Sequence, residues 1–413
     1  MTIPRADVDR LMADIHALSE YRLEDHSGWT RPVFSAPYVK ARDWVAARMT
    51  DAGLTVERDA VGNLIGTLPG TDPDLPPVVT GPHTDTVLSG GRLDGIYGVL
   101  GAIEAVRLLR ANGPLARTVK VIDFVGEEAS VFGISCMGSR AICNRLDDSH
   151  LALTDADGNT MAEGFRKVGG TPEQLETARW APGDLHCFLE LHIEQGTELE
   201  RRSTEIGVVD AITGIKRFRG TFTGQADHAG GTPMDRRHDA LTAAAECVLA
   251  LEEYAAPGGG VATAGRLEIE PGQPNVVPGK VEMWAELRSP DTAWLENGIA
   301  HFNATADRAC AQRGVSLESQ WLQAVEPVDS DPALVDTIDA AAQDLGYSTH
   351  RMISAAGHDA MHMATLAPMA MIFVPSIDGR SHCPEEWTEP AQLANGVHVL
   401  AETIHRTIQA EGR

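Results

Sequence analysis

The stretch Pro77-Val78-Val79-Thr80-Gly81-Pro82-His83-Thr84-Asp85 joins a short apolar run to a turn that carries a histidine and a carboxylate. A second carboxylate, Asp94, follows the segment Ser89-Gly90-Gly91, where glycine permits a tight return of the chain. A strand that ends in such residues delivers them to the edge of a sheet, where open α/β proteins bind their ligands. The stretch therefore predicts an α/β fold with a polar site at a strand end.

Short apolar segments alternate with helical segments around this stretch. Residues 78–80, 119–125 and 187–193 are strand-like, and residues 99–111 show helical spacing. This alternation is typical of a mostly parallel sheet covered on both faces. Further helices are expected at 6–20, 36–53, 332–345 and 390–410, and a further strand at 370–374.

The pattern changes in the middle of the chain. Residues 217–223 and 281–288 alternate apolar and polar side chains, which indicates antiparallel strands with one buried face. Two helices are expected beside them, at 235–255 and 291–313. We therefore predict an α/β catalytic domain with a mostly parallel sheet and an inserted α+β lid or dimerisation domain. The expected boundaries are 1–210 and 329–413 for the catalytic domain and 211–328 for the lid.

Length and composition restrict the class of protein. A chain of 413 residues exceeds one typical core, so two domains are expected. The net charge of −25 argues against nucleic-acid partners, which need a basic face. No apolar run approaches the ~20 residues that span a bilayer, and the first residues lack a signal-peptide core. The six cysteines form no CxxC pair and are expected as reduced thiols, which indicates a cytoplasmic protein without a membrane partner.

Four predicted strand ends each carry an imidazole or a carboxylate. Glu127 and Glu128 follow one strand as adjacent acids, which repel each other unless a cation or separate roles distinguish them. His192 closes another strand, and His382 follows the last one. Such side chains suit Zn²⁺, Mn²⁺, Co²⁺ or Ni²⁺. A carboxylate such as Asp94 can bridge two ions held about 3.5–4 Å apart.

Each of these residues also has an ordinary structural interpretation. A single histidine among the chain's 15 is more often a structural or surface residue than a ligand. Asp85 and Asp94 could cap turns, and Glu127 and Glu128 could cap the following helix. Capping alone does not account for such residues at four separate strand ends, so the set as a whole favours a metal site.

Seven short motifs occur between about residues 60 and 390. They are Gly81-Pro82-His83-Thr84-Asp85-Thr86-Val87, Gly90-Gly91-Arg92-Leu93-Asp94-Gly95, Glu127-Glu128, Leu191-His192-Ile193-Glu194-Gln195-Gly196, Ala226-Asp227-His228-Ala229-Gly230, Ala356-Gly357-His358-Asp359-Ala360 and Ser381-His382. With them the chain resembles the M20 clan of binuclear metallohydrolases. Within the clan it resembles the group of N-carbamoyl-L-amino-acid hydrolases, allantoate amidohydrolases and β-ureidopropionases. The resemblance implies that the insert is a lid and the interface of a homodimer.

The resemblance also implies two divalent metal ions per chain, with Zn²⁺, Mn²⁺, Co²⁺ and Ni²⁺ all possible. His83, Asp94 and His192 would hold one ion, and Asp94 would bridge to a second ion held by Glu128 and His382.

A base and a supporting carboxylate follow from the same resemblance. Glu127 would be the general base, and Asp85 would fix the orientation of the His83 imidazole. His192 stands where many M20 peptidases carry an acidic ligand. This version of the motif points to the branch that hydrolyses ureido groups.

Substrate contacts are implied mainly in the lid. His228 resembles the histidine that reaches an active site, that of the partner subunit, and polarises the scissile carbonyl. Asn275 and Arg288 resemble residues that grip the substrate carboxylate, for which arginine is well suited. From the sequence pattern alone, a solvated salt bridge is the simpler interpretation of Arg288. Gln195 and Gly357 match further substrate-contact positions.

These features predict hydrolysis of the ureido C–N bond of an N-carbamoyl-L-amino acid or a similar ureido acid, with release of ammonia, carbon dioxide and the amino acid. A peptidase or N-acyl-amino-acid hydrolase of the same clan is one alternative, and a non-catalytic metal-binding scaffold is another. Cys383 stands where the family more often has asparagine, and residues 27–34 match only loosely. The substrate and the native metal therefore stay open at this point.

Overall fold

The computed structural model describes residues 3–128 and 130–410, which form two compact units. The first unit contains the chain up to Asp210, Ser330–Met352 and the chain from His358 onward. The second unit contains Ala211–Asp329 and the short segment Ile353–Gly357. The predicted boundaries leave this short segment in the catalytic domain.

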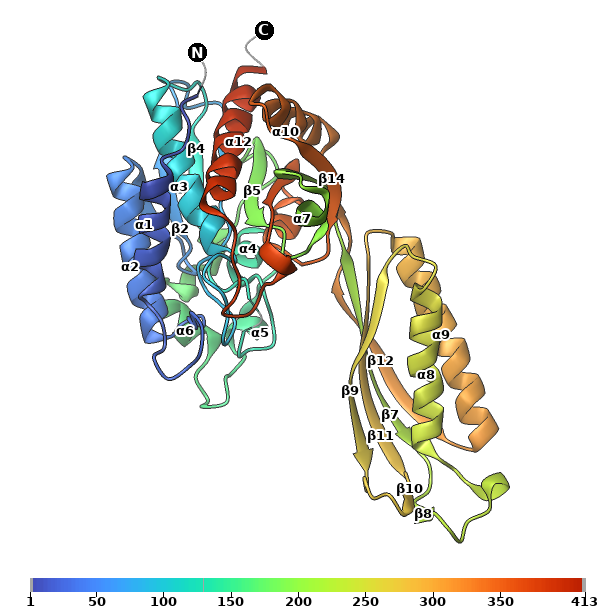
Figure 1. Cartoon of the computed structure of the whole chain (residues 1–413). Coiled ribbons are helices and arrows are strands. Elements are labelled where there is room, and N and C mark those ends of the chain that lie inside the picture. Colours follow the sequence, from blue (N-terminus) through green and yellow to red (C-terminus); the bar gives the residue numbers. More distant parts are fainter. Residues whose placement is uncertain (1–2, 129, 411–413) are drawn as a thin grey trace. The chain divides into compact units, whose positions relative to one another are not determined.

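A nine-stranded mixed sheet forms the centre of the first unit (Figure 1). Its middle is parallel, in the order β4 (Val119–Asp123), β3 (Val78–Thr80), β5 (Cys187–Ile193) and β15 (Met369–Val374). Antiparallel pairings extend both edges, from β4 to β2 (Leu64–Leu68) and β1 (Thr55–Arg58), and from β15 to β6 (Ile206–Ile212) and β13 (Val328–Asp329). Strand β14 (Thr349–Ser354) also pairs with β6. The predicted α/β class is confirmed, although the sequence pattern did not reveal the antiparallel edges.

The two faces of strand β5 have different surroundings. Its residues Leu189, Leu191 and Ile193 belong to the main hydrophobic core. Helices α3 (Ile96–Ala111) and α12 (Pro390–Gln409) pack against this strand. Because side chains alternate along a strand, Glu190 and His192 point to the opposite face. The short helices α4 (Met137–Ile142) and α11 (Ala360–Met363) pack against each other, and α11 also packs against β5.

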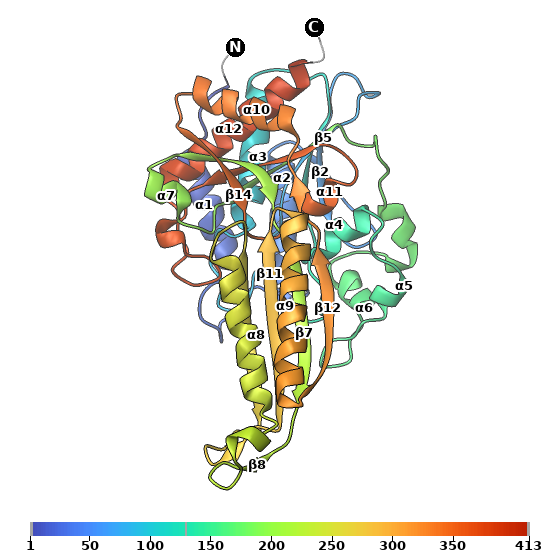
Figure 2. The ribbon, with the colours of Figure 1, turned by 90° about the vertical axis from the view of Figure 1, so that its right-hand side faces the viewer.

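Other helices complete the first unit (Figure 2). The longer ones are α1 (Val8–Ser19), α2 (Ala36–Asp51) and α10 (Pro332–Asp344). The shorter ones are α5 (Asp148–Leu151), α6 (Met161–Lys167), α7 (Glu198–Arg202) and the 3₁₀ helices η1 (Pro172–Ala178) and η3 (Ile377–Gly379). The predicted long helices all occur, with ends that differ by a few residues.

The second unit is an antiparallel sheet with two helices. Its strand order is β12 (Ser316–Val325), β7 (Gly214–Thr223), β11 (Lys280–Ser289) and β9 (Val261–Glu270). Helices α8 (Ala240–Ala255) and α9 (Thr292–Arg313) pack against it, and η2 (Met234–Arg236) precedes α8. A two-stranded antiparallel sheet of β8 (Asp227–His228) and β10 (Val276–Val277) lies at one end of this unit (Figures 1 and 2). The buried and partly exposed residues of β11 alternate strictly, which confirms the predicted period of two.

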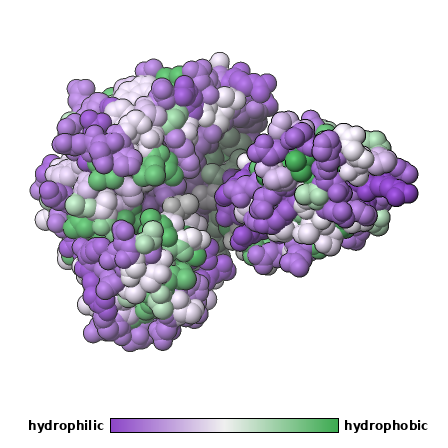
Figure 3. Space-filling model, turned by 90° about the horizontal axis from the view of Figure 1, so that it is seen from below, coloured by the Kyte–Doolittle hydropathy of each residue, from purple (hydrophilic) through white to green (hydrophobic). Residues whose placement is uncertain are grey.

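The surface of the described residues does not by itself indicate a function. Within 3–128 and 130–410, no helix combines the length and apolarity needed to cross a bilayer. The face shown in Figure 3 is mainly hydrophilic, with apolar residues in small groups. None of the six cysteines, which all lie within the described residues, forms a disulfide bond. Function therefore has to be sought among the polar residues at the strand ends.

Candidate metal centre

His83 lies just beyond the carboxyl end of β3 and is buried. Its segment is anchored to the neighbouring strand, since His83 pairs with Phe124. Gly81 has a φ of 132°, and a Cβ there would lie 1.8 Å from the carbonyl oxygen of Ile122. Only glycine permits this close approach. The imidazole Nδ1 is 3.1 Å from the backbone oxygen of Asp85, which leaves Nε2 free to act as a ligand.

Asp94 occupies the middle of the candidate site. Its Oδ1 lies 3.8 Å from His83 Nε2 and 3.2 Å from His192 Nε2. Its Oδ2 lies 2.9 Å from His382 Nε2, and Glu128 Oε1 is 3.5 Å from that same nitrogen. The two carboxylate oxygens thus face two different ligand groups. A carboxylate that bridges two ions needs this arrangement.

The predicted ligands form two candidate metal positions. The first position is His83, Asp94 and His192, and the second is Asp94, Glu128 and His382; within each, the ligand atoms lie within 4.8 Å of one another. Glu128 Oε1 is a buried atom that accepts no hydrogen bond from the described residues, an unfavourable state unless a cation compensates. Imidazole and carboxylate ligands suit Zn²⁺, Mn²⁺, Co²⁺ and Ni²⁺. The residues therefore fit two divalent ions.

His192 reaches the first position from β5. Its Nδ1 lies 2.9 Å from the carbonyl oxygen of Ile193, and its Nε2 accepts a hydrogen bond from Gly95 N at 3.1 Å. Gly95 has a φ of 67°, and a Cβ there would lie 2.4 Å from His83 Nε2. Glycine at this position therefore leaves room for the His83 imidazole next to Asp94.

Asp85 connects the first position with the two glutamates. Its Oδ1 accepts a hydrogen bond from Glu127 N and its Oδ2 from Glu128 N, each at 3.2 Å. The same Oδ1 is 3.5 Å from His83 Nδ1, whereas the backbone oxygen of Asp85 is 3.1 Å from that nitrogen. The carboxylate therefore orients the glutamate pair in addition to its predicted contact with the imidazole.

Glu127 lies beside the candidate ligands without joining either position. Its Oε2 is 3.5 Å from His83 Nε2, and its Oε1 accepts a hydrogen bond from Cys136 Sγ at 3.4 Å. Burial raises the pKa of Glu127 well above its ordinary value, and the charge of His83 offsets this only in part. Burial and the charge of Glu127 raise the pKa of the Cys136 thiol, which keeps its proton and can donate. A carboxylate oriented in this way is suited to proton transfer.

In the absence of metal, one of the candidate ligands, His382, is protonated at neutral pH. Burial by itself would raise the pKa of Asp94, but the adjacent imidazoles of His192 and His382 hold it well below its ordinary value. The hydrogen bond to Asp94 raises the pKa of His382 to about 9. His382 is therefore protonated at neutral pH, and a metal ion at the second position must displace that proton.

We expect metal binding to release at least one proton per chain at neutral pH. Because the pKa of His382 is raised to about 9, the apparent affinity of the second position should rise roughly tenfold per pH unit below that value and level off above it. Calorimetric titration with Mn²⁺ in two buffers of different ionisation enthalpy counts the protons. A binding enthalpy that is independent of the buffer would contradict this expectation.

Gln195, predicted as a substrate contact, lies directly beside Asp94. Its Nε2 donates to Asp94 Oδ2 at 2.9 Å and lies 3.1 Å from Ser381 Oγ. Gln195 has a φ of 57° and His382 has a φ of 56°. Non-glycine residues rarely adopt this left-handed conformation, and surrounding contacts must hold it in place. Two strained backbone positions therefore meet at the second metal position.

Two predicted substrate residues lie together in the second unit. The pairing of β8 with β10 sets His228 opposite Val276, next to Asn275. His228 Nδ1 accepts hydrogen bonds from Gly230 N and Gly231 N at 3.1 and 3.0 Å. In the neutral ring the proton is therefore on Nε2. Such an exposed donor is what polarisation of a carbonyl oxygen requires.

Arg288 lies near the end of β11 that is distant from β8 and β10. Its Nε donates to Glu286 Oε1 at 2.7 Å and its Nη1 to the carbonyl oxygen of Ala355 at 3.0 Å. The structure thus contains the salt bridge that the sequence pattern favours for this arginine. Gly357 lies in the loop between β14 and α11, directly before the buried His358.

Two buried groups beside His192 were not predicted. The ring centroid of His358 is 4.7 Å from that of His192, and Glu190 Oε1 is 3.5 Å from His358 Nδ1. Burial raises the pKa of Glu190 and lowers that of His358, which favours the uncharged form of both. The alternation of β5, which puts Glu190 on the face of His192, was the available signal.

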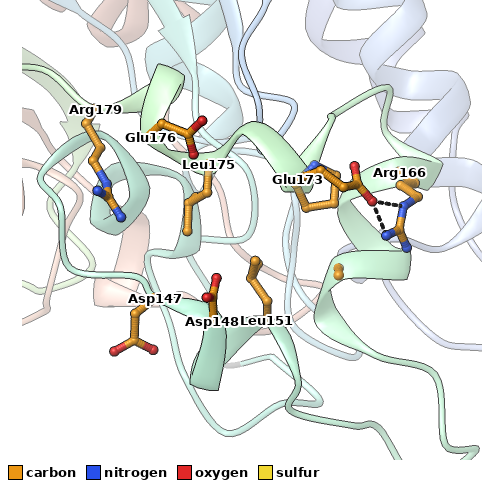
Figure 4. Close-up of a pocket in the computed structure, with 10 residues that line it drawn as sticks. Asp147, Asp148, Leu151, Arg166, Glu173, Leu175, Glu176 and Arg179 are labelled. Carbon is orange, nitrogen blue, oxygen red and sulfur yellow. Dashed lines mark hydrogen bonds and ion pairs between the residues drawn. The ribbon is translucent and has the colours of Figure 1, made fainter.

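None of the candidate residues above lines the cavity shown in Figure 4. This cavity has a volume of about 390 Å³ and is bounded by residues of α5, α6 and η1. Its wall combines the apolar Leu151 and Leu175 with charged side chains, and Arg166 and Glu173 form an ion pair at one side (Figure 4). The strand-end cluster, rather than this cavity, is therefore the candidate site.

The chain matches the family described as Peptidase family M20/M25/M40 over residues 68–406. This range contains every candidate metal ligand. The chain belongs to the M20 family. The resemblance found in the sequence motifs is confirmed.

The relatives of this M20 chain include amidohydrolases. N-carbamoyl-L-amino-acid amidohydrolase from Paenarthrobacter aurescens is 39% identical over 409 residues, covering 98% of this chain and 99% of that protein. Ureidoglycolate hydrolase from Arabidopsis thaliana is 38% identical, covering 96% of this chain and 86% of that protein. A crystal structure of an amidase of the hydantoinase/carbamoylase family from Burkholderia multivorans has a TM-score of 0.89 and 34% identity, with 98% of both chains covered.

This M20 chain is therefore an amidohydrolase of the carbamoylase group. Ureidoglycolate hydrolysis, the activity in the name of one relative, was not among the predicted activities.

Proposed function

We propose that the chain uses two divalent ions to hydrolyse the ureido C–N bond of an N-carbamoyl-L-amino acid or a similar ureido acid. The observation that carries this proposal is the environment of Asp94. One of its oxygens faces His192 at 3.2 Å, and the other faces His382 at 2.9 Å. Relatives named for carbamoyl and ureido substrates match nearly the whole chain, which supports the same class of substrate.

Glu127 is the proposed base and acid of the reaction. Divalent ions at the two positions would polarise the ureido carbonyl and lower the pKa of the attacking water. Glu127 takes the proton of that water and returns it to the departing nitrogen. Burial favours the protonated form of Glu127, which suits the second of these transfers. One water is consumed, and ammonia, carbon dioxide and the amino acid are released.

His228 and Arg288 cannot serve one small substrate from the same lid. Lys280 and Arg288 are eight residues apart on β11, which corresponds to about 27 Å at about 3.4 Å per residue. His228 pairs with β10, which precedes the Lys280 end of β11 in the chain. In a ureido acid the carbonyl and the carboxylate are only a few bonds apart. We therefore infer that the substrate binds between two copies of the chain.

The two ends of β11 would then serve different substrates. Arg288 lies at the end of β11 that pairs with Gly214 of β7. There it is the proposed partner of the substrate carboxylate. His228 and Asn275, at the opposite end of the lid, act on the substrate of the other copy.

The edge strand β9 is the proposed dimer surface. It forms one border of the second unit's sheet and exposes Val261, Leu267 and Ile269 by 58%, 38% and 38%. Helix α8 packs against β9 and exposes Leu249 by 61%. An exposed edge with apolar side chains is suited to pairing with another strand. A second copy placed there would form a homodimer through the lids.

Ammonia release across a panel of ureido acids tests the proposed function. The panel contains N-carbamoyl-α-amino acids, N-carbamoyl-β-alanine, allantoate and ureidoglycolate, each with Mn²⁺, Co²⁺, Ni²⁺ or Zn²⁺. We expect turnover of at least one of them. Turnover of dipeptides and N-acetyl amino acids, which yields no ammonia and is measured by the release of the free amino acid, should be slower. Faster cleavage of the latter two would favour the peptidase or N-acyl alternative. No turnover by the metal-loaded chain would favour a binding scaffold.

A further inference from the structure

Glu386 is a buried carboxylate in the loop that follows β15, four residues after His382. Its Oε1 accepts hydrogen bonds from Leu93 N and Asp94 N at 2.8 and 3.0 Å. Its Oε2 accepts a hydrogen bond from the hydroxyl of Ser381 at 2.7 Å. One side chain thus connects the loop that carries Asp94 with the loop that carries His382.

Ser381 extends this connection to a third segment. Its Oγ is 3.1 Å from Gln195 Nε2 and 3.5 Å from Asp94 Oδ2. Gln195 Nε2 also donates to Asp94 Oδ2 at 2.9 Å. The contacts converge on the one oxygen of Asp94 that faces His382. They therefore surround the second metal position.

The burial of Glu386 next to Asp94 is unfavourable by itself. Glu386 is 2% exposed, and burial together with the charge of Asp94 raises its pKa, against the effect of its hydrogen bonds. Space for the carboxylate depends on Gly91, where a Cβ would lie 2.1 Å from Glu386 Oε1. A carboxylate kept in such surroundings needs its full set of donors, and these donors belong to the loops of the site.

The backbone of the same loops is also strained. His382 and Gln195 both have left-handed φ values, of 56° and 57°. Ser381 precedes His382 in the chain and contacts Gln195 through its side chain. Left-handed non-glycine residues persist only where neighbouring contacts hold them. The hydrogen bond of Ser381 with Glu386 is one such contact.

We propose that Glu386 is a positioning residue that fixes Asp94 relative to His382 and so sets the affinity of the second metal position. This inference rests on the proposed two-metal function. Glu386 does not touch a metal ion or the substrate in this account; it acts through Asp94 and Ser381. Groups of this kind change metal affinity by about 10- to 100-fold when they are removed.

Metal binding by the full-length chain tests the inference, with Asp59 as a matched control. Asp59 also accepts two backbone hydrogen bonds on one oxygen, from Val61 N and Asn63 N, and a side-chain hydrogen bond on the other, from Asn63 Nδ2. Equilibrium dialysis against Mn²⁺ with elemental analysis measures both affinities without turnover. We expect Glu386→Ala to weaken one position by about 10- to 100-fold and the other much less. Asp59→Ala should change neither.

Two milder variants serve if Glu386→Ala does not fold. Glu386→Gln keeps the size of the side chain but loses one acceptor. Ser381→Ala keeps Glu386 but removes its hydrogen bond from Ser381, together with the Ser381 contacts to Gln195 and Asp94. Each should weaken the same position by a smaller factor. Wild-type affinity for both ions in folded variants would overturn the inference, as would equal weakening by Asp59→Ala. A wild-type chain that binds fewer than two ions would instead overturn the proposed metal centre itself.

Discussion

Glu127→Gln should keep both metal ions and lose turnover by about 10³- to 10⁴-fold, the upper part of the range for general acid–base catalysis. Glutamine has nearly the same shape and can still accept the hydrogen bond that Cys136 Sγ gives to Oε1. It cannot take up the proton of the attacking water. Because Glu127 belongs to neither metal position, the ions should stay bound. The measurements are kcat at saturating metal and the number of ions per chain.

Glu385→Gln is the control for this variant. Glu385 is an exposed acid that pairs with Arg380 close to His382 in the chain, and its loss should leave kcat nearly unchanged. Full activity in Glu127→Gln would remove Glu127 from the mechanism. Loss of a metal ion from Glu127→Gln would make it a ligand rather than the base.

A mixed dimer of His228→Ala and Glu127→Gln chains should recover about half of the wild-type activity, because one of its two sites is intact. Each variant alone is nearly inactive. Removal of a donor to a developing oxyanion typically lowers kcat by about 10²- to 10³-fold. Co-expression with two different affinity tags isolates the mixed dimers, and ammonia release measures their activity.

The pair Glu127→Gln and Arg288→Ala is the matched control for the shared site. If Arg288 serves the metal centre of its own chain, each site of this mixed dimer has one defect and no activity returns. Recovery in this pair would place Arg288 in the other copy's site. No recovery in the pair of His228→Ala and Glu127→Gln would show that each site is built within one chain.

Three of the candidate metal ligands could be located from the sequence because each follows an apolar run. His83, Glu128 and His192 lie at or just beyond the ends of β3, β4 and β5, where the pattern of buried strands is clear. The parallel centre of the sheet brings these ends to one edge. The separate roles of the ligands, in contrast, rest on the resemblance to the M20 family.

Other parts of the site depend on contacts between distant segments. No sequence pattern distinguishes Glu386 from the neighbouring Glu385. Its burial against Leu93 and Asp94 results from contacts between segments that are distant in the chain. Cys136 contacts Glu127 because of the path of the loop between them, and the sequence of this loop shows no periodic apolar pattern. The antiparallel strand β1 was not predicted because its residues are mostly exposed and show no alternation. Such features carry no local signal in the chain.

Ammonia release as a function of bound metal tests the central claim most directly. The chain is freed of metal with a chelator and titrated with Mn²⁺ in the presence of the best ureido acid of the panel, while the ions bound per chain are counted. We predict negligible release without metal and full release only when two ions are bound. Full release without metal, or a maximum at one ion per chain, would contradict it.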